Sequence, residues 1–215
     1  MVSVHLGPAW FFGADACLEA LASVIAFFVA LASFRVYRVT RERKYGYFTV
    51  SMVLLTLSFI SRAVTDALME EILFKVPARL VGSIFYAGYV AHILLALIAY
   101  LLLFMITHKL ADKRVIALLF LILIPSLLLS GSYYMSFYGI SALLLGFVAL
   151  AYWQNYRKVC KLAACLVFAA FSLLTVAQLL FLLEAHLKLF YVAAELTQAA
   201  GYLLLLFALI KTMFK

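Results

Sequence analysis

The chain has 215 residues, of which 69% are hydrophobic and 12% are charged, and its mean hydropathy is +1.17. This composition excludes a soluble globular domain and predicts an all-α integral membrane protein. Because each membrane-spanning helix needs about 20 apolar residues, we expect residues 1–215 to form one transmembrane domain without a separate catalytic domain. The net charge of +8 suits contact with membrane lipids, and we expect no nucleic-acid partner.

Seven apolar stretches separated by short polar gaps predict a seven-helix bundle, a multi-pass protein of the cell membrane. The fourth stretch is shorter than the others, and Pro125 within it is expected to kink its helix. The predicted spans are residues 10–34, 47–69, 80–107, 115–130, 133–153, 162–184 and 189–210.

The basic residues predict the orientation of these spans. Most of the 17 Lys and Arg residues fall in the first, third and fifth gaps and at the C-terminal end. Lys75, Arg79 and Lys188 fall in the opposite gaps, and Arg62 falls inside a span. Because short loops rich in Lys and Arg stay in the cytoplasm, we expect the N-terminus outside and the C-terminus inside.

A faint internal repeat relates the N-terminal part of the sequence to the C-terminal part. The segment Phe-Val-Ala-Leu-Ala occurs at 28–32 and again at 147–151, and each copy is followed by Tyr-Arg. The matches arise either by chance in a chain rich in Leu and Ala or from a duplication. A duplication predicts a three-plus-one-plus-three arrangement, in which two parallel three-helix repeats form a binding site at their interface.

Polar and ionisable residues inside the predicted spans concentrate in their outer halves. Such groups are costly in hydrocarbon, so we expect them to face one another, water or a ligand in a polar pocket open to the outside. Three interpretations stay open: a structural ion-pair network, a site for a small external ligand, cation or protons, and a hydrolytic or metal site. The predicted ligand-binding residues are Asp15, Glu19, Arg62, Asp66, His92, Gln178, Glu184, Glu195, Gln198 and Tyr202.

Arg62 and His92 are the central residues of this prediction. Asp66 lies one helical turn beyond Arg62, and Glu19 or Glu195 from neighbouring helices could also neutralise the guanidinium. His92 is expected near the membrane midplane. Three roles stay open for it: a satisfied core histidine, a titrating switch, and a metal or haem ligand. The chain has no HExxH motif and no nucleophile with an obvious base at the same depth, so we expect neither an enzyme nor a metal site.

Several short segments resemble membrane-associated sensor domains of the MASE type, which precede histidine kinases and cyclic-dinucleotide enzymes. The resemblance implies a sensor, and in that family the sensor is joined to a cytoplasmic output domain. This chain stops at Lys215, so we expect any signal to pass to a separate cytoplasmic or membrane protein partner. The matching segments are Leu18-Glu19, Leu57-Ser58, Asp66-Ala67-Leu68, Gly201-Tyr202-Leu203-Leu204 and Ala208-Leu209-Ile210.

The segment from Glu195 to Tyr202 is similar to the last helix of microbial rhodopsins, which carries an acidic counter-ion, a hydroxyl and the retinal-bearing lysine. Ala199 stands where that lysine would fall. A Schiff base needs the lysine amine, so a retinal cofactor is excluded and no other cofactor is expected. The resemblance implies a seven-helix architecture of the transporter, opsin and receptor type, and architecture alone does not carry function.

We therefore predict a receptor-like or sensor protein that binds a small ligand, a cation or protons in an outward-facing polar pocket. Binding would change which carboxylates are charged and which of them pair with Arg62. The alternative is a small secondary transporter, supported by the faint repeat and by Pro125. A third hypothesis is an intramembrane metal-dependent enzyme.

Overall fold

The structure is a computed structural model that describes residues 8–11, 13–72, 78–110, 118–119, 121–123, 133–184 and 186–213. Within these ranges the regular secondary structure is entirely helical. The elements are a short 3-10 helix η1 (Ala9–Phe11) and the α-helices α1 (Ala14–Thr40), α2 (Arg43–Ile72), α3 (Ala78–Thr107), α5 (Tyr133–Val159), α6 (Leu162–Leu183) and α7 (Leu189–Met213).

Six of these helices are long and apolar enough to cross a membrane. Their outward faces carry large apolar side chains, and Phe28 on α1 is 53% exposed while Leu143 on α5 is 66% exposed. A soluble protein would not leave so many apolar side chains in water, whereas hydrocarbon solvates them. These features indicate a multi-pass membrane protein. The predicted span 115–130 lies mostly outside the described residues, so it stays a prediction.

The helix α1 begins four residues after residue 10, the approximate start predicted for the first span. Residues 9–11 form η1 instead of the first turn of a long helix, and α1 begins only at Ala14. Gly13 separates the two because its φ of 84° lies in the left-handed region, which a continuous right-handed helix cannot contain. Asp15 then accepts hydrogen bonds from the backbone N–H groups of Gly13 and Ala16 at 3.0 and 2.9 Å, which helps to fix the start of α1.

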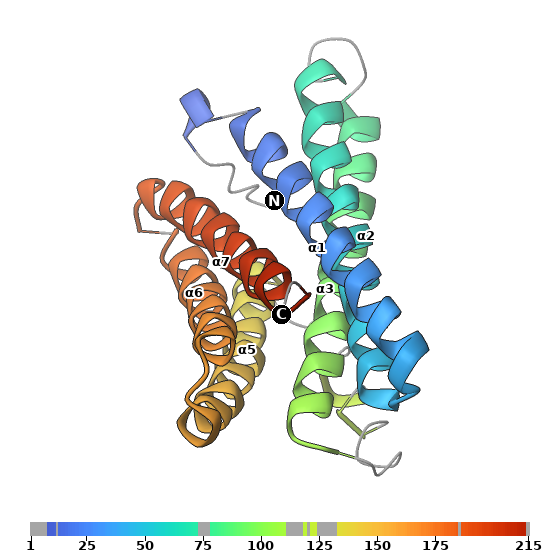
Figure 1. Cartoon of the computed structure of the whole chain (residues 1–215). Coiled ribbons are helices and arrows are strands. Elements are labelled where there is room, and N and C mark those ends of the chain that lie inside the picture. Colours follow the sequence, from blue (N-terminus) through green and yellow to red (C-terminus); the bar gives the residue numbers. More distant parts are fainter. Residues whose placement is uncertain are drawn as a thin grey trace.

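The six helices form a closed ring in which sequence neighbours pack together. One half consists of α1, α2 and α3, and the other half consists of α5, α6 and α7 (Figure 1). The ring closes through two junctions between the halves, where α1 packs against α7 and α3 packs against α5.

Both junctions join helices that run in the same direction. At one junction the rings of Tyr89, His92 and Phe104 on α3 lie against those of Tyr134, Phe137 and Phe147 on α5, in ascending order on both helices. At the other junction Asp15 and Glu19 on α1 lie near Tyr191 and Glu195 on α7, again in ascending order. The end of α3 and the start of α5 therefore lie at opposite ends of the bundle.

The two halves also match at an offset of 119 residues. Both bounds of α5 lie 119 residues after those of α1, and α6 begins 119 residues after α2. Arg41 and Cys160, which are also 119 residues apart, both follow a helix in the left-handed conformation. Each donates its backbone N–H to the carbonyl of a tyrosine, Tyr37 or Tyr156, at 2.8 Å. The sequence similarity between the halves therefore extends to the length of α1 and α5 and to the geometry with which these two helices end.

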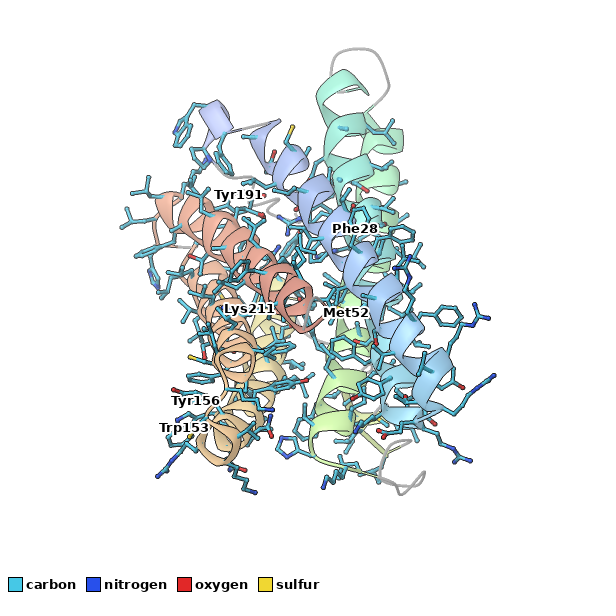
Figure 2. The ribbon with its side chains drawn as sticks, viewed as in Figure 1. Phe28, Met52, Trp153, Tyr156, Tyr191 and Lys211 are labelled. Carbon is cyan, nitrogen blue, oxygen red and sulfur yellow. The ribbon has the colours of Figure 1, made fainter. Side chains whose placement is uncertain are left out.

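The directions of the helices gather the basic side chains at one end of the bundle. The C-terminal ends of α1, α3, α5 and α7 and the N-terminal ends of α2 and α6 share this end, which we call the basic end. Trp153 and Tyr156 of α5 lie there, and Tyr191 of α7 lies toward the opposite end (Figure 2). The described basic residues of the basic end are Arg35, Arg38, Arg41, Arg43, Lys44, Lys109, Arg157, Lys158, Lys161 and Lys211.

Candidate functional site

Arg62 of α2 is the centre of a buried ion cluster, and only 2% of its side chain is exposed. Its Nε forms an ion pair with Glu19 of α1. Its Nη2 donates to Glu195 Oε1 of α7 at 2.8 Å. Glu19 and Glu195 are 0% and 1% exposed, so neither carboxylate is compensated by bulk water.

Two further carboxylates lie at the edge of this ion cluster. Asp66 lies one turn along α2 and its Oδ2 is 3.8 Å from Arg62 Nε. The Tyr191 hydroxyl accepts a hydrogen bond from Arg62 Nη2 at 2.9 Å and donates to Asp15 Oδ2 at 3.3 Å. Tyr191 therefore links Asp15 to the guanidinium, and the whole assembly draws side chains from α1, α2 and α7.

The ion cluster holds more negative than positive groups. Glu19, Asp66 and Glu195 all lie within 4.0 Å of the one guanidinium. If all three carboxylates are ionised, two negative charges remain uncompensated by protein groups. Glu19 Oε2 is buried and has no hydrogen-bond partner among the described residues. Because an unpaired charge in a low-dielectric interior is costly, this arrangement favours uptake of protons or of a small cation.

Aromatic rings pack around the guanidinium and separate it from lipid. The rings of Phe181 on α6 and Tyr191 on α7 lie 5.7 and 5.9 Å from Arg62 Cζ, within range of cation–π attraction. Tyr89 on α3 directs its hydroxyl toward Asp66 Oδ1 at 3.5 Å. These rings raise the strength of every ionic contact within the ion cluster because they exclude water from it.

The ion cluster lies across one junction of the two halves. Arg62 belongs to α2 and reaches Glu195 on α7, so a single side chain joins the first half to the second. At the 119-residue offset Glu19 corresponds to Tyr138, and Arg62 corresponds to Phe181. Both counterparts are buried, at 5% and 3% exposure. Burial at these two positions is thus shared between the halves, and only the first half carries charge there.

His92 lies apart from the ion cluster, against Ser58. The Ser58 hydroxyl lies 2.8 Å from His92 Nδ1 and 2.9 Å from the His92 carbonyl oxygen, to which it can donate. The His92 ring is packed among Phe59, Tyr89 and Phe137. These contacts fix the imidazole between α2, α3 and α5, which is the arrangement of a satisfied core histidine.

Gln178, Gln198 and Tyr202 lie outside the ion cluster. Gln178 Nε2 on α6 donates to Gln198 Oε1 on α7 at 3.4 Å. Tyr202 on α7 packs edge-on against Phe59 on α2 at a centroid distance of 5.2 Å. Neither contact includes Arg62, so the structure brings only part of the predicted site together.

Glu184 lies just beyond α6 and is only 9% exposed. Burial raises the pKa of its carboxyl from 4.5 to about 7, with Arg62 opposing the rise and Glu195 adding to it. This residue is therefore a group at the outer margin of the site that changes charge near neutral pH.

Tyr191 was not among the predicted site residues, although it makes two hydrogen bonds within the ion cluster. A signal was present in its spacing. Tyr191 precedes Glu195 by one helical turn, and Gln198 and Tyr202 continue the same face of α7. Phe181 carried no such signal, because a phenylalanine in an apolar helix is ordinary.

The described residues include no group of three or more His, Cys, Asp or Glu side chains arranged to hold a metal ion. The metal-dependent enzyme hypothesis therefore receives no support from this part of the chain. Comparisons of the chain with protein-family models, with curated proteins and with solved structures find no match. The resemblances to membrane-associated sensor domains and to microbial rhodopsins stay predictions.

Proposed function

We propose that this chain is a receptor-like or sensor protein of the cell membrane that responds to protons or to a small cation bound at the Arg62 ion cluster. The observation that carries the proposal is the imbalance of one guanidinium against Glu19, Asp66 and Glu195, all within 4.0 Å of it. An added positive charge reduces the excess, and the ion pairs of Arg62 then rearrange.

The position of the ion cluster supports a conformational response. Arg62 connects α2 to α7 at a junction between the two halves. Protonation of Glu195 would weaken this connection while Glu19 retains the guanidinium in the first half. Two arrangements of the junction that differ in proton or cation affinity are sufficient for a population shift. The basic end would carry the change to a separate cytoplasmic or membrane partner.

The proposed topology has seven crossings, with the N-terminus outside and the C-terminus inside. Two observations support it. The parallel packing of α3 and α5 places Thr107 and Tyr133 at opposite ends of the bundle. The 25 residues between them exceed the roughly 20 that a helical span needs. The basic end then lies in the cytoplasm by the distribution of Lys and Arg.

A duplication of a three-helix unit accounts for the two halves. Val29 and Val148 are both buried, Leu55 and Leu174 are both buried, and their spacing is the same 119 residues that relates the helix bounds. Chance similarity in a Leu-rich chain does not explain matched helix ends. In this proposal the ion cluster occupies an interface between repeats, which is the usual location of a binding site in repeated membrane folds.

The test measures the distance between the halves as the pH changes. Spin labels are attached to Cys17 of α1 and to a cysteine introduced at Leu187 before α7, with Cys160→Ser and Cys165→Ser removing the other thiols. We expect the distance distribution to differ between about pH 8 and about pH 5, because the ionisation of the carboxylates differs. Glu195→Gln, an uncharged isostere, should give the acidic distribution at both pH values.

The matched control is Glu42→Gln, which removes an exposed carboxylate that pairs with Lys44 at the basic end. This variant should titrate like the unmodified protein. A distance distribution that does not change with pH, together with no effect of adding Na⁺, K⁺ or Ca²⁺, would contradict the proposal. A response to one cation at constant pH would identify that cation as the signal.

A secondary transporter is the second candidate, favoured by the location of the ion cluster between two halves of the same orientation. A transporter must move its substrate across the membrane, whereas a sensor need not. Proteoliposomes loaded with a pH-sensitive dye separate the two: proton flux that Glu195→Gln abolishes and Glu42→Gln preserves would assign transport. Distance changes without flux would assign sensing.

A further inference from the structure

A cavity of about 910 Å³ opens at the basic end, far from the Arg62 ion cluster. It lies between the two halves, where the ends of α1, α2, α3, α5 and α7 converge. The sequence analysis predicted a polar pocket on the other side of the membrane, so this cavity is an additional feature. Its lining residues are Ser33, Val36, Lys44, Tyr45, Phe48, Ile106, Thr107, His108, Lys109, Ala151, Tyr152, Gln154, Asn155, Lys158 and Leu209.

The lining combines positive charge with hydrogen-bond donors. Lys44 belongs to α2, Lys109 follows the end of α3 and Lys158 belongs to α5, and Gln154 and Asn155 also line the cavity. The lining includes no aspartate or glutamate. The charge balance is therefore the reverse of that in the ion cluster, and the cavity attracts an anion.

Stabilisation of helix ends explains only part of this arrangement. Lys109 and Lys158 lie at the C-terminal ends of α3 and α5, where a positive charge compensates the exposed carbonyls. Lys44 lies in the first turn of α2, where the helix dipole disfavours a cation. Its ion pair with Glu42, at 2.6 Å, is weak because both side chains are more than half exposed. Lys44 therefore remains available to a ligand.

The lining of the cavity also includes apolar side chains. These are Val36, Phe48, Ala151 and Leu209, among others. Lysines can hold a phosphate group, and apolar side chains can contact a hydrophobic or flat portion of the same molecule. The cavity therefore suits a ligand that has both parts. Phosphate recognition by lysine uses charge-assisted hydrogen bonds of the kind that the three ammonium groups can supply.

We propose that the cavity at the basic end is a binding site for a phosphate-bearing anion held by Lys44, Lys109 and Lys158. The anion is either the headgroup of an anionic phospholipid or a soluble phosphate compound. This site is independent of the response proposed for the Arg62 ion cluster. Its occupant contacts both halves, so binding would stabilise one arrangement of α1, α2 and α3 relative to α5 and α7.

The experiment uses the full chain purified in a neutral detergent and has two arms. One arm titrates inorganic pyrophosphate and measures the shift in thermal unfolding. The other arm reconstitutes the chain into nanodiscs of phosphatidylcholine with a minor fraction of phosphatidylglycerol and counts the retained lipids by native mass spectrometry. We expect saturable binding in one arm, and the arm that binds identifies the source of the phosphate.

Two matched triple variants test the assignment of residues. Lys44→Gln, Lys109→Gln and Lys158→Gln together remove the cations of the cavity, and affinity should fall by about tenfold or more for each charge-assisted bond lost. The control combines Arg35→Gln, Arg38→Gln and Lys161→Gln, which removes the same charge from exposed positions of the basic end that do not line the cavity. The control should bind within about twofold of the unmodified chain.

A third variant separates cavity filling from charge. Ala151→Leu adds volume inside the cavity and leaves every lysine in place, so it should weaken binding without changing the net charge. Equal losses in both triple variants would show non-specific attraction and overturn the proposal. Absence of binding in both arms, with a folded and monodisperse protein, would overturn it as well.

Discussion

Arg62 and Glu195 are 133 residues apart in the sequence and are joined by a 2.8 Å charge-assisted hydrogen bond between Nη2 and Oε1. Both side chains are almost fully buried, and the bond crosses a junction between two three-helix halves. Because water does not reach this contact, its strength depends on the charge of each partner and on the neighbouring carboxylates. Several testable consequences depend on this contact and on the helix packing around it.

Removal of the guanidinium should be strongly destabilising. Arg62→Gln leaves three carboxylates without a cation, and we expect a loss of about 3–5 kcal/mol in the free energy of unfolding. Thermal unfolding in detergent would measure the loss. The triple variant Arg62→Gln, Glu19→Gln and Glu195→Gln should recover much of it, because the two most deeply buried carboxylates then carry no charge and only Asp66, at the edge of the ion cluster, lacks a cation. Arg38→Gln, at an exposed position, is the control, and an equal effect of both single variants would contradict the prediction.

Glu184 should make stability depend on pH. Its pKa is raised from 4.5 to about 7 in the folded protein, so between these values the folded state binds more protons than the unfolded state. Stability therefore decreases as the pH rises from about 4.5 to about 7, by at most about 3 kcal/mol from this group, and then levels off.

Glu184→Gln should remove this part of the pH dependence, as measured by unfolding midpoints across the range. Glu42→Gln serves as the control, since Glu42 is exposed at the other end of the bundle. If the two variants show the same dependence of midpoint on pH, Glu184 does not titrate in this window.

His92 should behave as a packing residue held by Ser58. A double-mutant cycle of Ser58→Ala and His92→Phe should give a coupling of about 1 kcal/mol, because each single change removes one shared hydrogen bond. The pH-dependent distance change between the halves should persist in Ser58→Ala. Loss of that change would instead assign His92 to the proton response.

Gly201 should be required for close packing of α6 and α7. A Cβ at this position would lie 2.9 Å from Leu174 Cδ2 and 3.2 Å from the Ala170 carbonyl oxygen. Gly201→Leu should therefore separate the two helices and cost on the order of 1–3 kcal/mol. Gly139→Leu is the matched control, because a Cβ there meets no atom within 4 Å. Equal thermal stability of the two variants would refute the prediction.

The orientation can be tested with one native thiol and one introduced thiol. Cys160 is exposed at the basic end, and Leu187, between α6 and α7, is 61% exposed at the opposite end. In intact cells a membrane-impermeant maleimide should label Leu187→Cys and leave Cys160 unlabelled until the membrane is permeabilised. The reverse pattern would invert the topology.

Hydropathy predicted the apolar part of each described helix but not its ends. The first span was predicted to end at residue 34, whereas α1 continues to Thr40. Likewise, α5 continues past the predicted residue 153 to Val159. Apolar composition indicates where a helix leaves the hydrocarbon of the membrane. The hydrogen-bonded backbone of the helix continues beyond that point into water, across residues such as Arg35 and Arg38. The helix ends only where Arg41 or Cys160 adopts the left-handed conformation.

The ion cluster was predictable in part. The spacing of Arg62 and Asp66 places them on one face of a helix, and the scarcity of cations in the spans made Glu19 and Glu195 natural partners. Whether they form a ligand site stays a prediction. The cavity at the basic end was not predictable. It depends on how the ends of five helices are placed relative to one another, and the periodicity of a single helix carries no information on the angles between helices.

The correspondence of Glu19 and Arg62 with Tyr138 and Phe181 has an evolutionary consequence. If the halves descend from one ancestral unit, an acid and a base were gained in one copy or lost in the other at two positions on different helices. Glu19 without Arg62 would have no cation in hydrocarbon, and Arg62 without Glu19 would lose one of its two fully buried carboxylate partners, so the two substitutions are expected to be inherited together. Homologous sequences should carry both ions or neither, and a lineage that retains only one should carry a compensating residue beside it.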